Sequence, residues 1–240
     1  MPDEGLQPGI AAIHVAHASS SRRTLVLTAC MMATFTAAVE SSIVATAMPT
    51  IVADLGGFNL FSWVFAVYLL TQAVSIPIYG RLSDIYGRKK VFFVGAGLFL
   101  IGSTLCGFAG NMATLIVFRA LQGFGAGGVQ PVATTILGDV YAPAERAHVQ
   151  GLVSSVFGFA AIAGPSLAAF LVEHIGWQAV FWVNLPIGIT AIAMIAMFLD
   201  ESVQHRPHRI DYLGSLLLFM AIAVSSRARG RNWPPEKDCG

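Results

Sequence analysis

The stretch LVLTACMMATFTAAVESSIVATAMPTIVA (residues 25–53) is uncharged and mostly apolar, apart from a single ionisable side chain, that of Glu40. A helix of about 20 apolar residues is enough to cross the hydrocarbon core of a membrane. The stretch is therefore long enough to span a bilayer, and Glu40 lies about midway along it. A carboxyl group at that depth is costly to keep charged, so it marks a candidate functional site.

The composition of the whole chain also indicates a membrane protein. The chain is 55% hydrophobic and 11% charged, whereas an ordinary soluble domain is roughly 25% charged. Charges this sparse could not cover a water-facing surface. The net charge of +1 provides no basic face for nucleic acid. Residues 1–21 contain no Lys or Arg, so the first apolar run is predicted to be a retained membrane helix and not a signal peptide.

Polar breaks separate the apolar runs into predicted spans at 25–53, 60–80, 91–109, 113–138, 149–172, 178–199 and 211–226. Up to the last of these spans, basic residues occur only in alternate connections: Arg22, Arg23, Arg81, Arg88, Lys89, Lys90, Arg146, Arg206 and Arg209. The connections near Asp54, Asn111 and Glu173 have none. By the positive-inside rule, this alternation predicts an all-α, multi-pass protein of the cell inner membrane with a cytoplasmic N-terminus.

The predicted organisation is a cytoplasmic tail, a six-helix unit, a cytoplasmic loop, the start of a seventh helix and a polar tail, at 1–23, 24–200, 201–210, 211–224 and 225–240. The polar tail, SSRARGRNWPPEKDCG, follows the apolar GSLLLFMAIAV abruptly. We expect a truncation or a frameshift after about Val224. The alternative is a genuine short tail after a re-entrant or interfacial segment.

A polar motif, GRLSDIYGRKKV (80–91), connects the second and third predicted spans. Its glycines permit a close helix–loop–helix approach, and its aspartate and first following basic residue are spaced to pair locally. The candidate residues of this cytoplasmic gate motif are Gly80, Asp84, Gly87, Arg88 and Lys89. An ordinary positive-inside loop would explain the basic residues but not the spacing of the glycines and the aspartate.

The stretch FRALQGFGAGGVQPV (118–132) places Arg119 inside the fourth predicted span. An arginine in a membrane helix is a candidate functional residue, although it could instead extend to a nearby interface. Gln122, Gly123 and Gly127 are candidate packing residues of this helix, since small residues four apart let another helix approach closely.

The stretch GFAAIAGPSLAAF (158–170) lies in the fifth predicted span. Pro165 removes a helix hydrogen bond and can bend the helix. Gly158 and Gly164 keep its surface small for tight packing. A generic packing helix with a proline kink is the alternative.

Taken together, these motifs resemble those of the major facilitator superfamily. The motif at 80–91 is similar to the family's G-x-L-x-D-x-x-G-R-[KR] loop, and the Arg119 stretch is similar to its fourth-helix motif, whose arginine is implicated in proton coupling. GPSLAA resembles the antiporter signature G-P-x-x-G-G, with Ala168 and Ala169 in place of the last two glycines.

A more specific resemblance is to the fourteen-helix drug:proton antiporters of the EmrB/QacA type. VESSIVATAMPTI is similar to their first-helix motif L-D-x-T-I-V-N-V-A-L-P, with Glu40 at the acidic position and Ala45 where asparagine is common. WQAVFWVNLPIG (177–188) and DYLGSLLL (211–218) resemble the starts of their sixth and seventh helices.

The resemblance implies the N-terminal half of a transporter that exports amphipathic or cationic small molecules in exchange for protons. In it, Glu40 would carry protons, Arg119 would tune or relay them, and the proton gradient would replace any cofactor. Na⁺ coupling, or a Glu40 that stays protonated and hydrogen-bonded, remains an alternative. The expected partners are the substrate, the lipid bilayer, and a missing C-terminal half or a partner chain.

A second hypothesis is a non-transporting remnant, scaffold or sensor derived from such a transporter. An enzyme is not expected, because the sequence contains no recognisable nucleophile–base pair and no metal-ligand spacing. The three cysteines are expected to be packing residues.

Overall fold

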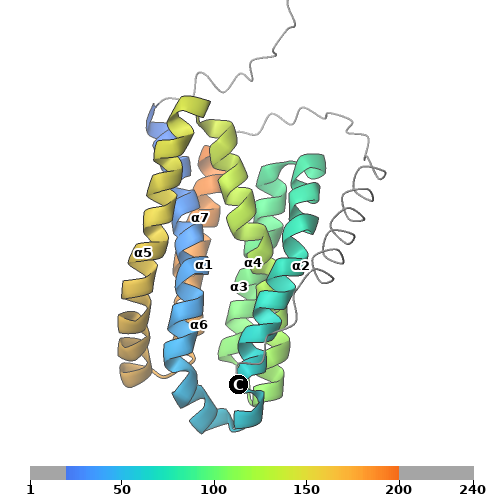
Figure 1. Ribbon diagram of the computed structural model, residues 1–240, viewed down its shortest axis with the longest axis vertical. Helices are drawn as coiled ribbons and strands as arrows, with labels where there is room; N and C mark the ends of the chain where they lie inside the picture. The colour runs from blue at the N-terminus through green and yellow to red at the C-terminus, as the bar shows by residue number, and fades with distance from the viewer. Residues whose placement is uncertain (1–19, 200–240) are drawn as a thin grey trace, which may run out of the picture. The chain divides into compact units, whose positions relative to one another are not determined.

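The computed structural model describes residues 20–199 of the chain (Figure 1). Most of the predicted N-terminal tail, the loop at 201–210, the seventh helix at 211–224 and the polar tail at 225–240 lie outside the described residues. The expected truncation therefore stays a prediction.

The described residues form helices and no strand, which confirms the all-α prediction. The elements are α1 (Ser20–Leu55), the 3₁₀ turn η1 (Phe58–Leu60), α2 (Phe61–Tyr86), α3 (Arg88–Gly107), α4 (Met112–Val140), α5 (Pro143–His174), α6 (Ala179–Trp182) and α7 (Asn184–Phe198). Six helical segments are long and apolar enough to cross a membrane, with α6 and α7 together forming the sixth.

The helices extend beyond the predicted apolar runs, most clearly around the motif at 80–91. This motif is not a loop: α2 continues to Tyr86, and α3 begins at Arg88. Only Gly87 separates them, with a φ of 94° that side-chain-bearing residues rarely adopt. Hydropathy indicates where a chain can lie in lipid, but a helix can continue through polar residues into water.

Two sets of helices pack along their lengths in Figure 1. α4 packs against α2 and α3, while α1 packs against α5 and α7. Contacts between α1 and α4 join the two sets.

Glycines of α4 explain its close contacts. A β-carbon on Gly123 would lie 2.4 Å from the carbonyl oxygen of Tyr68, and one on Gly127 would lie 2.0 Å from Ser75 Oγ. A β-carbon on Gly125 would lie 2.2 Å from the backbone nitrogen of Phe99 in α3. Larger residues would push these helices apart, so Gly123 and Gly127 lie where α4 approaches α2 most closely.

The two motif glycines of α5 have different surroundings. A β-carbon on Gly164 would lie 2.1 Å from Ser42 Oγ of α1. Among the described residues, nothing lies within 4 Å of a β-carbon built on Gly158. α5 turns a single stripe toward α1, including Val153, Ala160 and Gly164, and Gly158 lies off this stripe. Gly80 in α2 is open in the same way.

The basic connections lie together at one end of the bundle, here called the basic end. There, the Arg23 guanidinium donates to the carbonyl of Val140 at 3.0 Å and contacts Glu145 Oε2 at 2.7 Å. At the opposite end, the indole nitrogen of Trp177 donates to Asp54 Oδ2 at 2.7 Å. The structure thus agrees with the alternation of charged and uncharged connections in the sequence.

Candidate functional site

The centre of the site is an ion pair buried between α1 and α4. Nη1 of Arg119 contacts Oε1 of Glu40, and both side chains are 0% exposed. Arg119 therefore lies inside the bundle and does not extend to the interface, so that alternative is wrong. Its guanidinium also stacks 4.1 Å above the ring centre of Tyr68 in α2, within the range of a cation–π interaction.

Three neutral side chains extend the ion pair into a hydrogen-bonded network. Arg119 Nη1 donates to Gln122 Oε1 at 2.9 Å, and Gln122 Nε2 donates to Ser103 Oγ at 3.1 Å. Asn184 donates both to Glu40 Oε2 and to Ser103 Oγ. Gln122, Ser103 and Asn184 are all buried. The network consequently joins α1, α3, α4 and α7 around one carboxylate.

The hydrogen bonds of this network determine which of its atoms donate and which accept. Ser103 directs its one hydroxyl proton to the carbonyl of Phe181 at 2.8 Å, so its oxygen can only accept from Gln122 and Asn184. Glu40 receives Arg119 on one oxygen and Asn184 on the other. This arrangement suits an ionised, acceptor-only carboxylate.

The network is not built for stability alone. Among the described residues, Arg119 Nη2 and the hydroxyl of Tyr68 are buried without a hydrogen-bond partner. Buried polar atoms without partners are destabilising, and in native structures each one needs an explanation. A buried ion pair is itself weak evidence for stabilisation, because removing both charges from water offsets much of their attraction. The arrangement indicates a functional site.

Sequence reasoning identified the two charges but missed most of their neighbours. Gln122 was expected only to pack, and Cys106, also treated as packing, has its sulfur 3.5 Å from Gln122 Oε1. Ser103 and Asn184 were not singled out. Each is a polar residue in an apolar run, which is a weak signal, because many such residues bond only within their own helix.

At the basic end, the motif of 80–91 forms the predicted local pair and more. Arg88 Nη1 lies 3.2 Å from Asp84 Oδ1, as predicted, and Arg88 Nε also contacts Asp139 at the end of α4. Lys89 Nζ donates to the carbonyls of Ala196 and Leu199 at 2.8 and 2.6 Å, where α7 ends. Lysine is a common cap at this position, because the last carbonyls of a helix have no partner within it. The motif thus ties α2, α3, α4 and α7 together.

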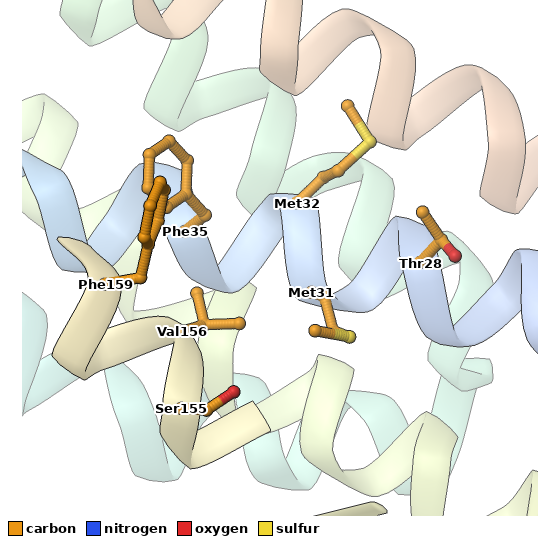
Figure 2. A pocket seen from close by; sticks show the side chains of 7 residues that line it. All are labelled: Thr28, Met31, Met32, Phe35, Ser155, Val156 and Phe159. Atoms are coloured by element: carbon orange, nitrogen blue, oxygen red, sulfur yellow. The ribbon is translucent and has the colours of Figure 1, made fainter. Parts of the chain in front are cut away.

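A cleft of about 460 Å³ opens between α1 and α5 (Figure 2). Its lining is Thr28, Met31, Met32, Phe35, Ser155, Val156 and Phe159, with no charged side chain. The rings of Phe35 and Phe159 lie 5.9 Å apart between centroids, one from each helix. The Thr28 and Ser155 hydroxyls donate to carbonyls of their own helices, which leaves their oxygens as acceptors. The cleft suits an apolar ligand with a hydrogen-bond donor.

Gly164 of the helix-five motif packs against α1 just past the level of Glu40, on the side away from the cleft. Gly164 admits Ser42, two residues beyond Glu40, into direct contact with α5. Pro165 is exposed beside it. Within residues 20–199, no group of three or more His, Cys, Asp or Glu side chains is placed to hold a metal ion.

Known proteins are similar to this chain in sequence and in fold. The profile of the Major Facilitator Superfamily matches residues 30–226. Multidrug resistance protein 3 of Bacillus subtilis (strain 168) is 45% identical over 185 residues, covering 77% of this chain and 36% of that protein. Multidrug transporter protein MdtP of the same organism is 40% identical over 202 residues, covering 84% of this chain and 37% of that protein.

A fungal relative and a solved structure extend the comparison. Efflux pump FUS6 of Gibberella moniliformis (strain M3125 / FGSC 7600) is 34% identical over 209 residues, covering 85% of this chain and 37% of that protein. The crystal structure of the human organic anion transporter MFSD10 (TETRAN) superposes with a TM-score of 0.60 at 18% identity, covering 75% of this chain and 48% of that one. This last likeness concerns the fold alone.

The chain spans about a third of the length of the curated relatives it matches (36% and 37% of the two bacterial proteins). The matched region includes the buried ion pair, the motif at 80–91 and the cleft-lining residues from Met31 onward. With its six apolar helical segments, this is a multi-pass membrane protein, and the chain belongs to the Major Facilitator Superfamily.

Proposed function

We propose that the chain takes part in proton-coupled export of amphipathic small molecules by alternating access. The observation that carries this proposal is the fully buried Glu40–Arg119 pair in the middle of a membrane-spanning bundle. Relatives named as multidrug transporters and efflux pumps support the export of drug-like compounds.

The pair provides a physical means of coupling. In a medium of low dielectric constant, the attraction between a carboxylate and a guanidinium is much stronger than in water. Protonation of Glu40 removes that attraction and leaves the Arg119 charge buried without its counter-ion. The bundle then gains by a rearrangement that brings Arg119 a new partner or water. Uptake and release of one proton can therefore favour two different conformations.

The α1–α5 cleft supports a substrate class. Two flexible methionines, Met31 and Met32, can adapt to different apolar shapes, and Phe35 and Phe159 provide aromatic surface. Cations would need a carboxylate, but Glu40 is already engaged by Arg119 and Asn184. Of the amphipathic and cationic substrates expected from the sequence, the cleft favours uncharged aromatic amphiphiles.

Alternating access requires a second set of helices that rocks against this one. We propose that a C-terminal half or a partner chain supplies it, since the relatives are about three times as long as the region they share with this chain. The basic end would face the cytoplasm and the motif of 80–91 would gate that side of an inner membrane, as the positive-inside rule predicts.

The test is efflux of N-phenyl-1-naphthylamine, a neutral aromatic amine, from energised membrane vesicles that contain the protein together with its second set of helices. We expect the imposed proton gradient to drive its transport, and Glu40→Gln to abolish that transport at unchanged membrane abundance. Glu173→Gln makes the same change on an exposed residue of α5 and should have no effect. If the unaltered protein shows no gradient-dependent transport, a scaffold or sensor becomes the better reading.

A further inference from the structure

Asn184 is the first residue of α7, inside the sixth membrane-spanning segment, where Val183 keeps helical backbone angles (φ −59°, ψ −24°). α6 ends at Trp182, and α7 begins at Asn184, with Val183 between them. The side chain of Asn184 is 1% exposed, and its amide nitrogen contacts both Glu40 Oε2 and Ser103 Oγ. A buried asparagine at the α6–α7 junction that contacts an ionisable group is well placed to respond to that group.

The surrounding donors determine which oxygen of Glu40 can accept a proton. Oε1 faces the guanidinium of Arg119, a permanent donor. Oε2 accepts from the amide of Asn184, which can rotate. The other titratable groups near Glu40 are Tyr68 of α2 and Cys106 of α3; α6 and α7 contain none, and those of α5 lie at its ends. A proton taken up by Glu40 therefore resides on Oε2.

A proton on the Oε2 lone pair that now accepts from Asn184 conflicts with the present orientation of the amide, because O–H and N–H donors would then face each other. A half-turn of the amide presents Oδ1 to the protonated carboxyl and restores a hydrogen bond. That half-turn also brings Oδ1 against Ser103 Oγ, whose proton points to Phe181. Ser103 must then rotate its hydroxyl toward Asn184, and the carbonyl of Phe181 loses the side-chain donor that Ser103 supplied.

We propose that Asn184 is a positioning residue whose amide reverses when Glu40 is protonated. This reversal changes the hydrogen bonds at the α6–α7 junction. In the ionised state, the hydrogen bonds run from Asn184 to Glu40 and from Ser103 to Phe181. In the protonated state, they run from Glu40 to Asn184 and from Ser103 to Asn184. No covalent bond changes, and the proton stays on the carboxyl. The inference rests on the proposed function for the biological use of that proton.

The last turn of α7 connects the α6–α7 junction to the basic end. Lys89 donates to the carbonyls of Ala196 and Leu199 at that end, next to Arg88 and its two carboxylate partners. α7 is thus held by Glu40 at its first residue and by Lys89 at its last turn. Loosening the first contact shifts the equilibrium of a helix that also contacts the motif of 80–91.

The experiment measures hydrogen exchange of the purified full chain in lipid nanodiscs over a pH series, with each rate divided by the intrinsic chemical rate. Peptides covering Phe181–Gly188 should exchange about fivefold faster on the acid side, the factor expected when one neutral hydrogen bond is lost. Asn184→Leu should abolish this acid-side increase in exchange, and Asn184→Ser, which can both donate and accept, should restore part of it. Glu40→Gln should remove the pH dependence.

Thr36→Val is the matched control, because Thr36 is a buried residue of α1 whose hydroxyl donates to a carbonyl of its own helix. The acid-side increase in exchange should be the same in this variant as in the unaltered chain. If Asn184→Leu does not fold, Ser103→Ala decides, since the Phe181 carbonyl then lacks the hydroxyl donor of Ser103 at every pH and the acid-side increase in exchange should vanish. An increase that persists in either variant, or is missing from the unaltered chain, overturns the inference. An increase without gradient-driven transport leaves the inference standing and rejects the proposed function instead.

Discussion

Glu40 and Arg119 are 79 positions apart in the sequence, yet they form an ion pair whose two side chains are completely withdrawn from solvent. The pair joins α1 to α4, and Asn184 and Gln122 attach α7 and α3 to it. A rearrangement at this carboxylate therefore changes contacts of four helices.

The two charges should be strongly coupled in stability. Removing one partner of a buried ion pair leaves an uncompensated charge, so we expect Arg119→Met to lower the free energy of unfolding by about 3–5 kcal/mol. The double variant Glu40→Gln/Arg119→Met should recover much of this loss. Denaturant unfolding in micelles measures the cycle, and a loss in the double variant equal to the sum of the two single losses would show that the charges do not interact.

Close packing of α4 against α2 should make Gly123 intolerant of a side chain. We expect Gly123→Ala to lower the free energy of unfolding by about 1–3 kcal/mol, as overpacking typically does. Gly138 provides a control in the same helix, because a β-carbon there meets nothing within 4 Å among the described residues. Gly138→Ala should be neutral or slightly stabilising in the same thermal melts. Similar losses for both would contradict the packing argument.

The two carboxylates around Arg88 should have small effects on stability. Asp84 and Asp139 are 68% and 42% exposed, and exposed ion pairs contribute about 0.2–1 kcal/mol each. Asp84→Asn and Asp139→Asn should therefore leave the melting temperature almost unchanged. If the motif gates transport, both variants should still slow efflux in vesicles. Normal efflux in both would remove the gating role.

The aromatic pair of the α1–α5 cleft should contribute to ligand binding. We expect Phe159→Ala to weaken binding of N-phenyl-1-naphthylamine by about two- to tenfold, the range expected for one aromatic contact. Phe170 is also an exposed aromatic of α5, but it stacks on His174 outside the cleft, so Phe170→Ala should bind the probe normally. Fluorescence titration in nanodiscs distinguishes the two, and identical affinities would argue against the cleft.

The sequence predicted the fold class well, because lipid imposes a simple requirement. A segment in lipid must satisfy its own backbone hydrogen bonds and present apolar side chains, so apolar runs locate the helices. Helix ends were less predictable. α2 passes through the polar residues of the motif to Tyr86, and the span predicted at 178–199 consists of α6 and α7. Hydropathy marks the polar residues of the motif but does not say whether a helix continues through them.

The site was predicted only in part, for a related reason. A charge in an apolar run is conspicuous on its own, so Glu40 and Arg119 were identified directly. Ser103 and Asn184 are ordinary polar residues until the fold places them beside those charges. Gly158 shows the converse: its size favours close packing, but the stripe that α5 turns toward α1 leaves it out.

The sequence by itself therefore determined that this is a multi-pass helical protein of the family, with a carboxyl and a guanidinium at membrane depth. Only the tertiary structure decided that the two charges pair, that Asn184 and Ser103 orient the carboxylate, and that Lys89 holds the end of α7. The physical reason is that burial of a charge follows from local composition, whereas a hydrogen-bonded partner depends on how helices distant in sequence rotate and pack against one another.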